Sequence, residues 1–576
     1  MPRLQINTST RAQSSPSALL KDGLMQHNPA DVQPLHGHSL TLHNATLPVN
    51  MLPNEILVEI LRLTAGCLEL DGMTSWLASA MGACQHWREI IVNTPIFWTD
   101  IELTKNPHFV ELCLARSDGT NISVHLPKQH PDGPQVAADF SPALSLLAPH
   151  HRKISHLDLH LNCTNWNSRL DQSLLSTLEA ALPGLVSLHL TTRPGFRLRL
   201  QESHLPSLRS LSLTNVAVDW ASLQQLSRLT SLTLSGIVHP NERNRFLASL
   251  LDLLEACECL ESFTYERWEI LHDQAIANDR IVSLPRMRHF YISGLPADIM
   301  QVTTRLSFPR EAHLSLEMFD LHTEAHPNNE LPVLAAVLPR DTAHLPALTD
   351  VRHIMAWFER YKLLVYADER RCTFWESQAS KSSDCKAPAG EDPPVVPSLC
   401  MVYHLPGAES DDYVLANVAR ELGAFFPRAL ETCVLRGAMD LVDTAVWARM
   451  LAAFPRVGHL ELIAIACDIK TFPPALAPTP DGVPCPCLRK LVLHYAPSEE
   501  DGGRQMLSEL YWVLKMRDDA GCRLEALSIQ VEPLGDDMFF MPSDVVSRLP
   551  PDLADIERNL ESVVSSLEIM LLIDDD

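Results

Sequence analysis

The segment LPSLRSLSL (205–213) decides the fold of this chain, because its pattern of apolar residues returns along much of the sequence. Leu211 and Leu213 alternate with polar residues, as in a short strand with one buried face. The proline cannot continue a helix, so it ends a helix that precedes the strand. Seven further segments have this spacing, with or without the proline: LPGLVSLHL (182–190), LSRLTSLTL (226–234), CECLESFTY (257–265), LPRMRHFYI (284–292), FPRVGHLEL (454–462), PCLRKLVL (486–493) and CRLEALSI (522–529).

These segments predict a stacked array of strand and helix units. Within each group of neighbouring segments they recur at intervals of about 21 to 36 residues, at or above the ~20–29 residues of leucine-rich repeats. Helical runs lie between them, such as Phe246 to Leu254, whose apolar residues recur at helical spacing. One such unit cannot bury its own apolar face, so neighbours must stack. We therefore predict an α/β fold, an irregular leucine-rich-repeat solenoid, with an ordinary α/β domain as the alternative.

The composition argues against several classes of function. The 576 residues include 71 acidic and 46 basic side chains, and the formal net charge is −25. A surface this acidic, with no concentrated basic block, predicts no nucleic-acid partner. The chain has 42 prolines but only 21 glycines. Glycine-rich nucleotide folds are therefore disfavoured.

The start of the sequence and its cysteines indicate a compartment. Residues 1–15 are polar and lack the apolar core of a signal peptide. No apolar run reaches the ~18 residues of a transmembrane helix, so we expect no membrane association. The 14 cysteines are scattered, many in apolar periodic stretches. This favours reduced thiols in an intracellular protein, cytoplasmic or nuclear, over a disulfide framework.

Changes in composition divide the sequence into four parts. Residues 1–45 are polar, proline-containing and without a period, and predict a disordered arm. A helical domain is predicted at 46–103 and the repeat array at 104–533. The array contains a flexible polar and proline-rich insertion at 377–398. Residues 534–576 are predicted to form a C-terminal helical segment, with an apolar run from Leu553 to Ile573, and an acidic tail.

The block from Leu52 to Leu103 predicts three short helices. Pro53 suits a first helical turn, and Glu55 lies near the positive end of the helix dipole. The second helix is predicted around Leu77 to Cys84 and the third around Trp87 to Ile91. About 45 residues are near the lower limit for an independent core. Such a unit needs a partner or a neighbouring domain to cover its apolar surface.

Three short motifs in this block resemble a known family. They are Leu52-Pro53-x-Glu55-Ile56-Leu57, Cys84-x-x-Trp87-Arg88 and Thr94-Pro95-x-x-Trp98. In this order they resemble an F-box, and more narrowly the F-box-like proteins abundant in mushroom-forming (basidiomycete) fungi. In that family the motif precedes a strand, a helix and a second strand, here at 98–103, 107–117 and 121–126. A leucine-rich array usually follows. Two features depart from the family pattern: Gln85 and His86 replace common basic residues, and the link between the first two helices is long and carries Glu69 and Asp71.

The resemblance implies a substrate receptor of an SCF-type ubiquitin ligase, and not an enzyme. The partners would be the Skp-family adaptor, a cullin-based ligase and an unknown protein substrate on the repeat surface. Carried over by position, the adaptor-binding residues would be Leu52, Pro53, Ile56, Leu57, Ile60, Leu61, Cys84 and Trp87. Ile60, Cys84 and Trp87 can equally belong to the small core. The alternative function is a leucine-rich-repeat scaffold without ubiquitin-ligase association.

The sequence offers no constellation for catalysis or metal binding. No HExxH, GxSxG, GxGxxG or GxxxxGK[ST] motif occurs. Cys257-x-Cys259 and Cys485-x-Cys487 have one intervening residue and fall at repeat starts, where they replace apolar anchors. A hydrolase with a site outside these motifs is the third hypothesis. We therefore predict no catalytic residue, no metal and no cofactor.

Overall fold

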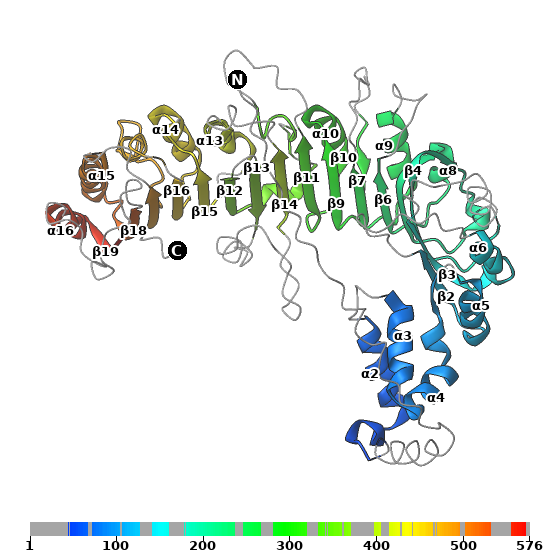
Figure 1. Ribbon diagram of the computed structural model, residues 1–576. Coiled ribbons are helices and arrows are strands. Elements are labelled where there is room, and N and C mark those ends of the chain that lie inside the picture. The colour runs from blue at the N-terminus through cyan, green and yellow to red at the C-terminus, as the bar shows by residue number, and fades with distance from the viewer. Residues whose placement is uncertain are drawn as a thin grey trace, which may run out of the picture. The chain divides into compact units, whose positions relative to one another are not determined.

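The computed structural model of the protein divides into two compact units (Figure 1). The first unit comprises residues 1–102 and 113–120, and the second comprises 103–112 and 121–576. The structure describes residues 44, 46–66, 72–103, 106–126, 141–160, 178, 180–236, 246–266, 280–319, 332–339, 341–342, 344–359, 362–369, 397–404, 414–426, 429–440, 442–464, 467, 469–495, 502–531 and 554–571. The predicted arm at 1–45, apart from Asn44, and residues 377–396 of the predicted insertion lie outside these ranges.

The first unit contains three helices in the positions predicted from the sequence. They are α2 (Asn54–Gly66), α3 (Gly72–Ala83) and α4 (Gln85–Asn93). A 3-10 turn, η2 (Pro48–Met51), precedes them, and η3 (Pro95–Trp98) and strand β1 (Asp100–Glu102) follow. Both turns begin with proline, whose fixed φ suits a first helical position. In Figure 1 the three helices pack against one another at the blue end of the chain.

A small apolar core holds these helices together. Leu57 and Leu61 of α2, Leu77 of α3 and Ile91 of α4 are each at most 2% exposed. Trp98 lies beneath them, and its Nε1–H donates a hydrogen bond to the carbonyl oxygen of Ile91, 2.8 Å away. Burying such side chains contributes about 1.5–3 kcal/mol each. This hydrogen bond satisfies Nε1–H, the only polar group of the Trp98 side chain.

The second unit is a mixed α/β structure built on one large, mostly parallel sheet. Its strands are β2 (Ile122–Leu126), β3 (Ile154–His160), β4 (Ser187–Leu198), β5 (Ser210–Val218), β6 (Ser231–Ser235), β7 (Ser262–Glu266), β9 (His289–Gly294), β11 (His313–Phe319), β12 (His353–Glu359), β13 (Lys362–Asp368), β14 (Leu399–His404), β15 (Thr432–Gly437), β16 (His459–Ala464), β17 (Lys490–Tyr495), β18 (Leu524–Val531) and β19 (Val564–Leu571). Two short strands, β8 (Val282–Ser283) and β10 (Leu306–Ser307), pair separately. Figure 1 shows the long strands side by side in a row.

Helices connect many of these strands. They are α5 (Pro107–Arg116), α6 (Ser141–Leu147), α8 (Trp220–Gln224), α9 (Phe246–Ala256), α10 (Pro296–Thr303), α11 (Pro346–Thr349), α13 (Val414–Phe425), α14 (Thr444–Ala453), α15 (Gly502–Asp519) and α16 (Ala554–Val563). The 3-10 turns η4 (Ala148–Lys153), η5 (Glu202–His204) and η8 (Pro473–Leu476) join them. The helix predicted at Phe246 is confirmed as α9. Parallel neighbours need crossover connections of this kind.

All eight repeated sequence segments end in strands of this sheet. From β4 to β9 the residues Leu188, Leu211, Leu232, Phe263 and Phe290 pair in register, and each is at most 1% exposed. The residues between them point to the opposite face of the sheet, as the alternation of a strand requires. The predicted α/β class with a strand in every repeated segment is confirmed.

The middle of the sheet departs from chain order. Strand β14 pairs with β11, and β12 pairs with β15, so the three strands β12, β13 and β14 occupy the sheet in reverse order. Strand β13 is antiparallel to both of its neighbours, whereas the pairs β2–β3 to β7–β9, β9–β11, β11–β14, β12–β15 and β15–β16 to β18–β19 are parallel. The connection between β12 and β13 is short (359 to 362), which only an antiparallel hairpin permits. The regular spacing of leucines did not predict this inserted meander.

The C-terminal segment contains a helix and a strand. Helix α16 ends at Val563, and strand β19 follows at once and pairs in parallel with β18. Leu567 and Ile569 of β19 lie opposite Leu527 and Ile529 of β18. The apolar residues of β19 therefore alternate with the period of a strand. Helix is therefore found at 554–563 and strand at 564–571, because a short apolar run suits either structure and here it pairs with β18.

Candidate functional site

An exposed apolar stripe on α2 is the most distinctive surface of the first unit. Ile56 is 51% exposed, Ile60 36% and Leu63 59%. Their spacing of four and three residues places them on one side of the helix. Leu57 and Leu61, one position further on, point to the other side and fill the core. Among the described residues of the unit, Leu57 and Leu61 of α2 are covered, whereas Ile56, Ile60 and Leu63 remain exposed.

The apolar surface extends to the turn before α2. Met51 is 73% exposed and Leu47 is 37% exposed. Leu52 is half-buried, and Pro53 is exposed just before the first residue of α2. With the stripe on α2, these residues form a surface that we call the α2 stripe: Leu47, Met51, Leu52, Pro53, Ile56, Ile60 and Leu63. Single exposed apolar residues are ordinary, but a run of them on one element marks an interaction surface.

The polar residues that flank the stripe pair with each other. Arg62 Nη2 lies 2.8 Å from Glu59 Oε1 on the same helix, and both side chains are exposed. The hydrogen bond from Arg62 holds the pKa of the Glu59 carboxyl below its usual value. The charges thus lie beside the apolar side chains without covering them.

Cys84 and Trp87 serve the architecture of this unit. The backbone N–H of Trp87 donates to Sγ of Cys84, 3.5 Å away, so the thiol caps the start of α4. Nε1–H of Trp87 donates to Oδ1 of Asn50 at 2.7 Å, and Nδ2 of Asn50 donates to the carbonyl of Asn44 at 2.7 Å. Both side chains are half-buried. Trp87 thereby holds η2, which ends at Met51, against α4.

The predicted adaptor-binding residues differ in how deeply the structure buries them. Leu57 and Leu61 are 0% and 2% exposed, so they are core residues and are not available at the surface. Leu52, Pro53, Ile56 and Ile60 do lie at the surface. Met51 and Leu63 were absent from the predicted set, although their exposure is greatest. The heptad-like spacing of Ile56, Ile60 and Leu63 was visible in the sequence, but it does not say which side of a helix is covered.

Of the two Cys-x-Cys pairs in the second unit, the first cysteine of each, Cys257 and Cys485, packs in the core. Burial raises the pKa of the Cys257 and Cys485 thiols to about 12. Cys257 is the first residue of its repeated segment, Cys485 directly precedes the segment at 486–493, and each is at most 1% exposed. Their companions Cys259 and Cys487 lie nearer the surface. All of the cysteines that the structure describes carry free thiols.

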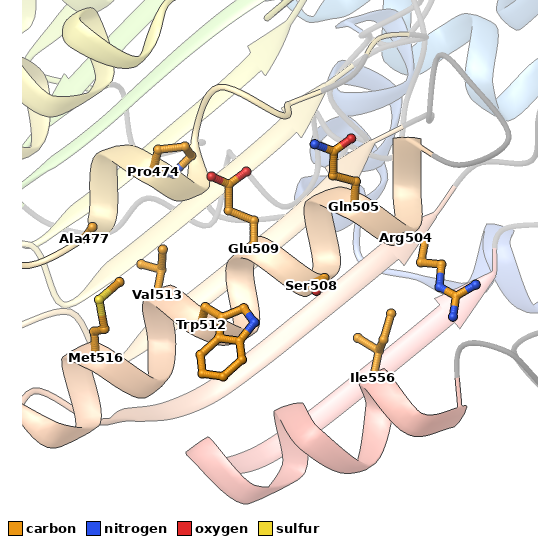
Figure 2. Close-up of a pocket in the computed structure, with 10 residues that line it drawn as sticks. All are labelled: Pro474, Ala477, Arg504, Gln505, Ser508, Glu509, Trp512, Val513, Met516 and Ile556. Carbon is orange, nitrogen blue, oxygen red and sulfur yellow. The ribbon is translucent and has the colours of Figure 1, made fainter.

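A surface groove lies along α15 in the second unit (Figure 2). It has a volume of about 840 Å³. Trp512 is 56% exposed and Met516, one turn further along the helix, is 44% exposed. Figure 2 shows Pro474 of η8 and Ile556 of α16 on opposite sides of α15. Arg504, Gln505 and Glu509 add polar groups, so the groove suits a ligand of mixed polarity. Sequence analysis did not single out this site.

Two tryptophans of the second unit are buried. Trp447 is fully buried and stacks edge-on against Phe472. Trp357 is 6% exposed, with the guanidinium of Arg436 4.5 Å from its ring centre. Trp268 lies outside the described residues.

The comparisons with known proteins give no family assignment. Neither a scan against protein-family models nor a search of curated protein sequences found a match to this chain. Among the helices that the structure describes, none combines the length and hydropathy needed to cross a bilayer.

Proposed function

We propose that the protein is an F-box-type substrate receptor, in which the first unit binds a Skp-family adaptor and the second unit presents a protein substrate. The observation that carries this proposal is the α2 stripe. A helical unit this small leaves Ile56, Ile60 and Leu63 exposed on one side of a helix whose other side is its core. Exposing such side chains to water is unfavourable, so a protein partner that covers them would gain free energy.

The order of motifs supports the same reading. The LPxEI, CxxWR and TPxxW motifs fall on the start of α2, the start of α4 and η3, respectively. Strand β1, helix α5 and strand β2 follow in the order typical of the F-box-like proteins that the sequence resembles. Within the unit, Cys84 caps α4 and Trp87 binds Asn50 of η2. In this proposal they position the stripe.

The second unit would act as a divergent leucine-rich-repeat solenoid. Its parallel strands and intervening helices fit that architecture, and the polar faces of the strands offer an extended binding surface. Catalysis would come from the ligase, because the receptor raises the effective concentration of substrate beside a ubiquitin-charged enzyme. The leucine-rich-repeat scaffold without ligase association is the competing function.

Co-purification of the full chain with a Skp-family adaptor tests the proposal. We expect the wild-type chain to bind, and the double variant Ile56→Gln/Ile60→Gln to lose at least tenfold in affinity. Ile281→Gln is a matched control, because Ile281 is 53% exposed and Ile56 is 51% exposed, but Ile281 lies in the second unit. Gln is a good helix former, so α2 is retained.

Two results would count against the proposal. If the wild-type chain does not bind under conditions in which a known F-box protein does, the scaffold function is favoured. If it binds and the double variant binds equally well, the α2 stripe is not the contact surface, and Leu52→Ala/Pro53→Ala then tests the start of the helix alone.

A further inference from the structure

Three metal-ligating side chains converge on the polar face of strands β3 and β4. Asp158 and His160 are two residues apart on β3, so they point to the same face. His189 of β4 pairs in register with Asp158. One ligating atom from each of the three side chains lies within 4.8 Å of the others. All three belong to the second unit, remote in sequence from the α2 stripe.

The three side chains lie close together and remain partly exposed. Nε2 of His160 lies 3.3 Å from Oδ1 of Asp158, and the two imidazole rings of His160 and His189 have centres 4.8 Å apart. Each residue is half-buried, so the strands hold it while solvent still reaches it. Oδ1 of Asp158 is buried, and its contact with Nε2 of His160 does not have the geometry of a hydrogen bond. A cation bound between these side chains would compensate the charge of the buried carboxylate oxygen.

We propose that Asp158, His160 and His189 bind a divalent transition-metal ion, with Zn²⁺ as the preferred ion. Two imidazole nitrogens and one carboxylate oxygen suit zinc, whereas Ca²⁺ and Mg²⁺ require more oxygen ligands. Zinc ligands lie about 2.0–2.2 Å from the metal. Rotation of the side chains about their χ angles would bring the three atoms into that shell. Three protein ligands leave a fourth position for water or for a side chain of a partner.

His125 is a candidate for the fourth position. It lies on β2 in register with Asp158, on the side away from His189. Residues paired in this way point to the same face of the sheet. His125, Asp158 and His189 therefore form a row across three strands, with His160 one step further along β3. A metal ion here would link β3 to β4, and with His125 also to β2.

A second pair of histidines in the same sheet provides an internal comparison. His289 of β9 and His313 of β11 are also in register, and their rings stack with centres 5.3 Å apart. Burial, then the neighbouring His313 and Arg288, lower the pKa of His289. Among the described residues, the only group of three or more potential ligands is the one formed by Asp158, His160 and His189. The stacked pair thus offers two imidazoles without the carboxylate.

The proposal departs from the expectation of no metal site drawn from the sequence. His160 and His189 are 29 residues apart in the sequence, a spacing that matches no short zinc motif. Their proximity depends on the parallel register of β3 and β4, which sequence periodicity alone does not fix.

Zinc binding to the full chain, stripped of metal with a chelator, tests the site. We expect the wild-type chain to bind one more equivalent of zinc than His160→Asn/His189→Asn, in competition with a chromophoric chelator. The control His289→Asn/His313→Asn is expected to bind as the wild type does. With Co²⁺ as probe, the equivalent lost in the first variant should show visible d–d bands without thiolate charge-transfer absorption, because the site contains no cysteine.

Asp158→Asn keeps the experiment decisive if the double variant fails to fold. Asn has nearly the same volume, and the side chain is partly exposed, so this variant is expected to fold. Zinc should raise the Tm of the wild type and of the His289/His313 control, but should raise that of Asp158→Asn far less. Equal zinc stoichiometry in the wild type and His160→Asn/His189→Asn, or an equal rise in Tm for Asp158→Asn and the wild type, would overturn the proposal. So would failure of the wild type to bind zinc.

Discussion

The indole Nε1–H of Trp87 donates a hydrogen bond to Oδ1 of Asn50 across 2.7 Å, joining residues 37 positions apart in the first unit. It ties helix α4 to η2, the turn that carries the exposed Met51. Since Asn50 in turn donates to the carbonyl of Asn44, one indole fixes the entry of the chain into the helical unit. The position of the α2 stripe therefore depends on a residue that is not part of it.

Trp87→Phe should weaken this connection. The ring is kept, but one hydrogen bond is lost and Oδ1 of Asn50 loses its donor, so we expect a loss of about 1 kcal/mol in the free energy of unfolding of the first unit. Hydrogen exchange at residues 48–66 should quicken. Trp512→Phe is the control, because Trp512 is 56% exposed and lies in the second unit. Unchanged exchange in Trp87→Phe would show that the bond is not formed in solution.

Neighbouring leucines of α2 should separate core from surface. Leu61→Ala removes a side chain that is 2% exposed, and we expect a loss of about 2–5 kcal/mol in the free energy of unfolding of the first unit. Leu63→Ala removes one that is 59% exposed, and the change should stay within about 0.5 kcal/mol. Chemical denaturation of the full chain, followed by hydrogen exchange in 54–66, measures both. Similar losses in the two variants would contradict the assignment of the two sides of α2.

Arg517 should stabilise the second unit through backbone carbonyl groups. Its guanidinium is fully buried and donates to the carbonyl oxygens of Pro484 at 2.6 Å and Cys485 at 2.9 Å. Arg517→Met keeps the aliphatic stem but leaves these acceptors without a donor, so we expect a loss of about 2–4 kcal/mol. Arg489→Met is the control, because Arg489 is exposed and its pair with Glu525 is on the surface. A loss in the control as large as that in Arg517→Met would refute this role.

Glu421 should make stability depend on pH. Its Oε2 accepts from the backbone N–H groups of Val333, Leu334 and Ala335 at 3.1, 2.6 and 3.1 Å. Burial nevertheless raises the pKa of this carboxyl above its ordinary value. The folded chain therefore keeps the proton to higher pH than the unfolded chain does. Protonated Glu421 therefore contributes its full stabilisation at pH values below the ordinary pKa of Glu. This stabilisation is lost as pH rises through the higher pKa that Glu421 has in the folded chain.

Glu421→Gln should remove this pH dependence. The Tm of the wild type minus that of the variant is expected to fall as pH rises from about 4.3, the ordinary pKa of Glu. Glu431→Gln, at an exposed ion pair with Arg352, is the control and should leave the slope of the wild type in place. A constant difference in Tm between wild type and Glu421→Gln across this range would contradict the assignment.

The sequence by itself determined the local elements of this protein. The spacing of leucines in segments such as 205–213 placed a strand in every repeated segment, because alternation and helix-ending prolines act over a few residues. The helices α2, α3 and α4 were also predicted from local signals. These are Pro53 before α2, Thr94-Pro95 after α4, and the helical spacing of apolar residues. The motifs that suggest an F-box are likewise contiguous in the sequence.

Only the tertiary structure decided which surfaces remain free and which distant residues meet. Leu57 and Ile56 are adjacent in sequence and equally apolar, but packing against α3 and α4 buries the first and exposes the second. The reversed order of β12, β13 and β14 and the conversion of 564–571 to a strand depend on which sheet edge is available. His160 and His189 share a site only because β3 and β4 pair in parallel register. Pairing and burial are set by contacts between distant segments, and a local pattern carries no information about them.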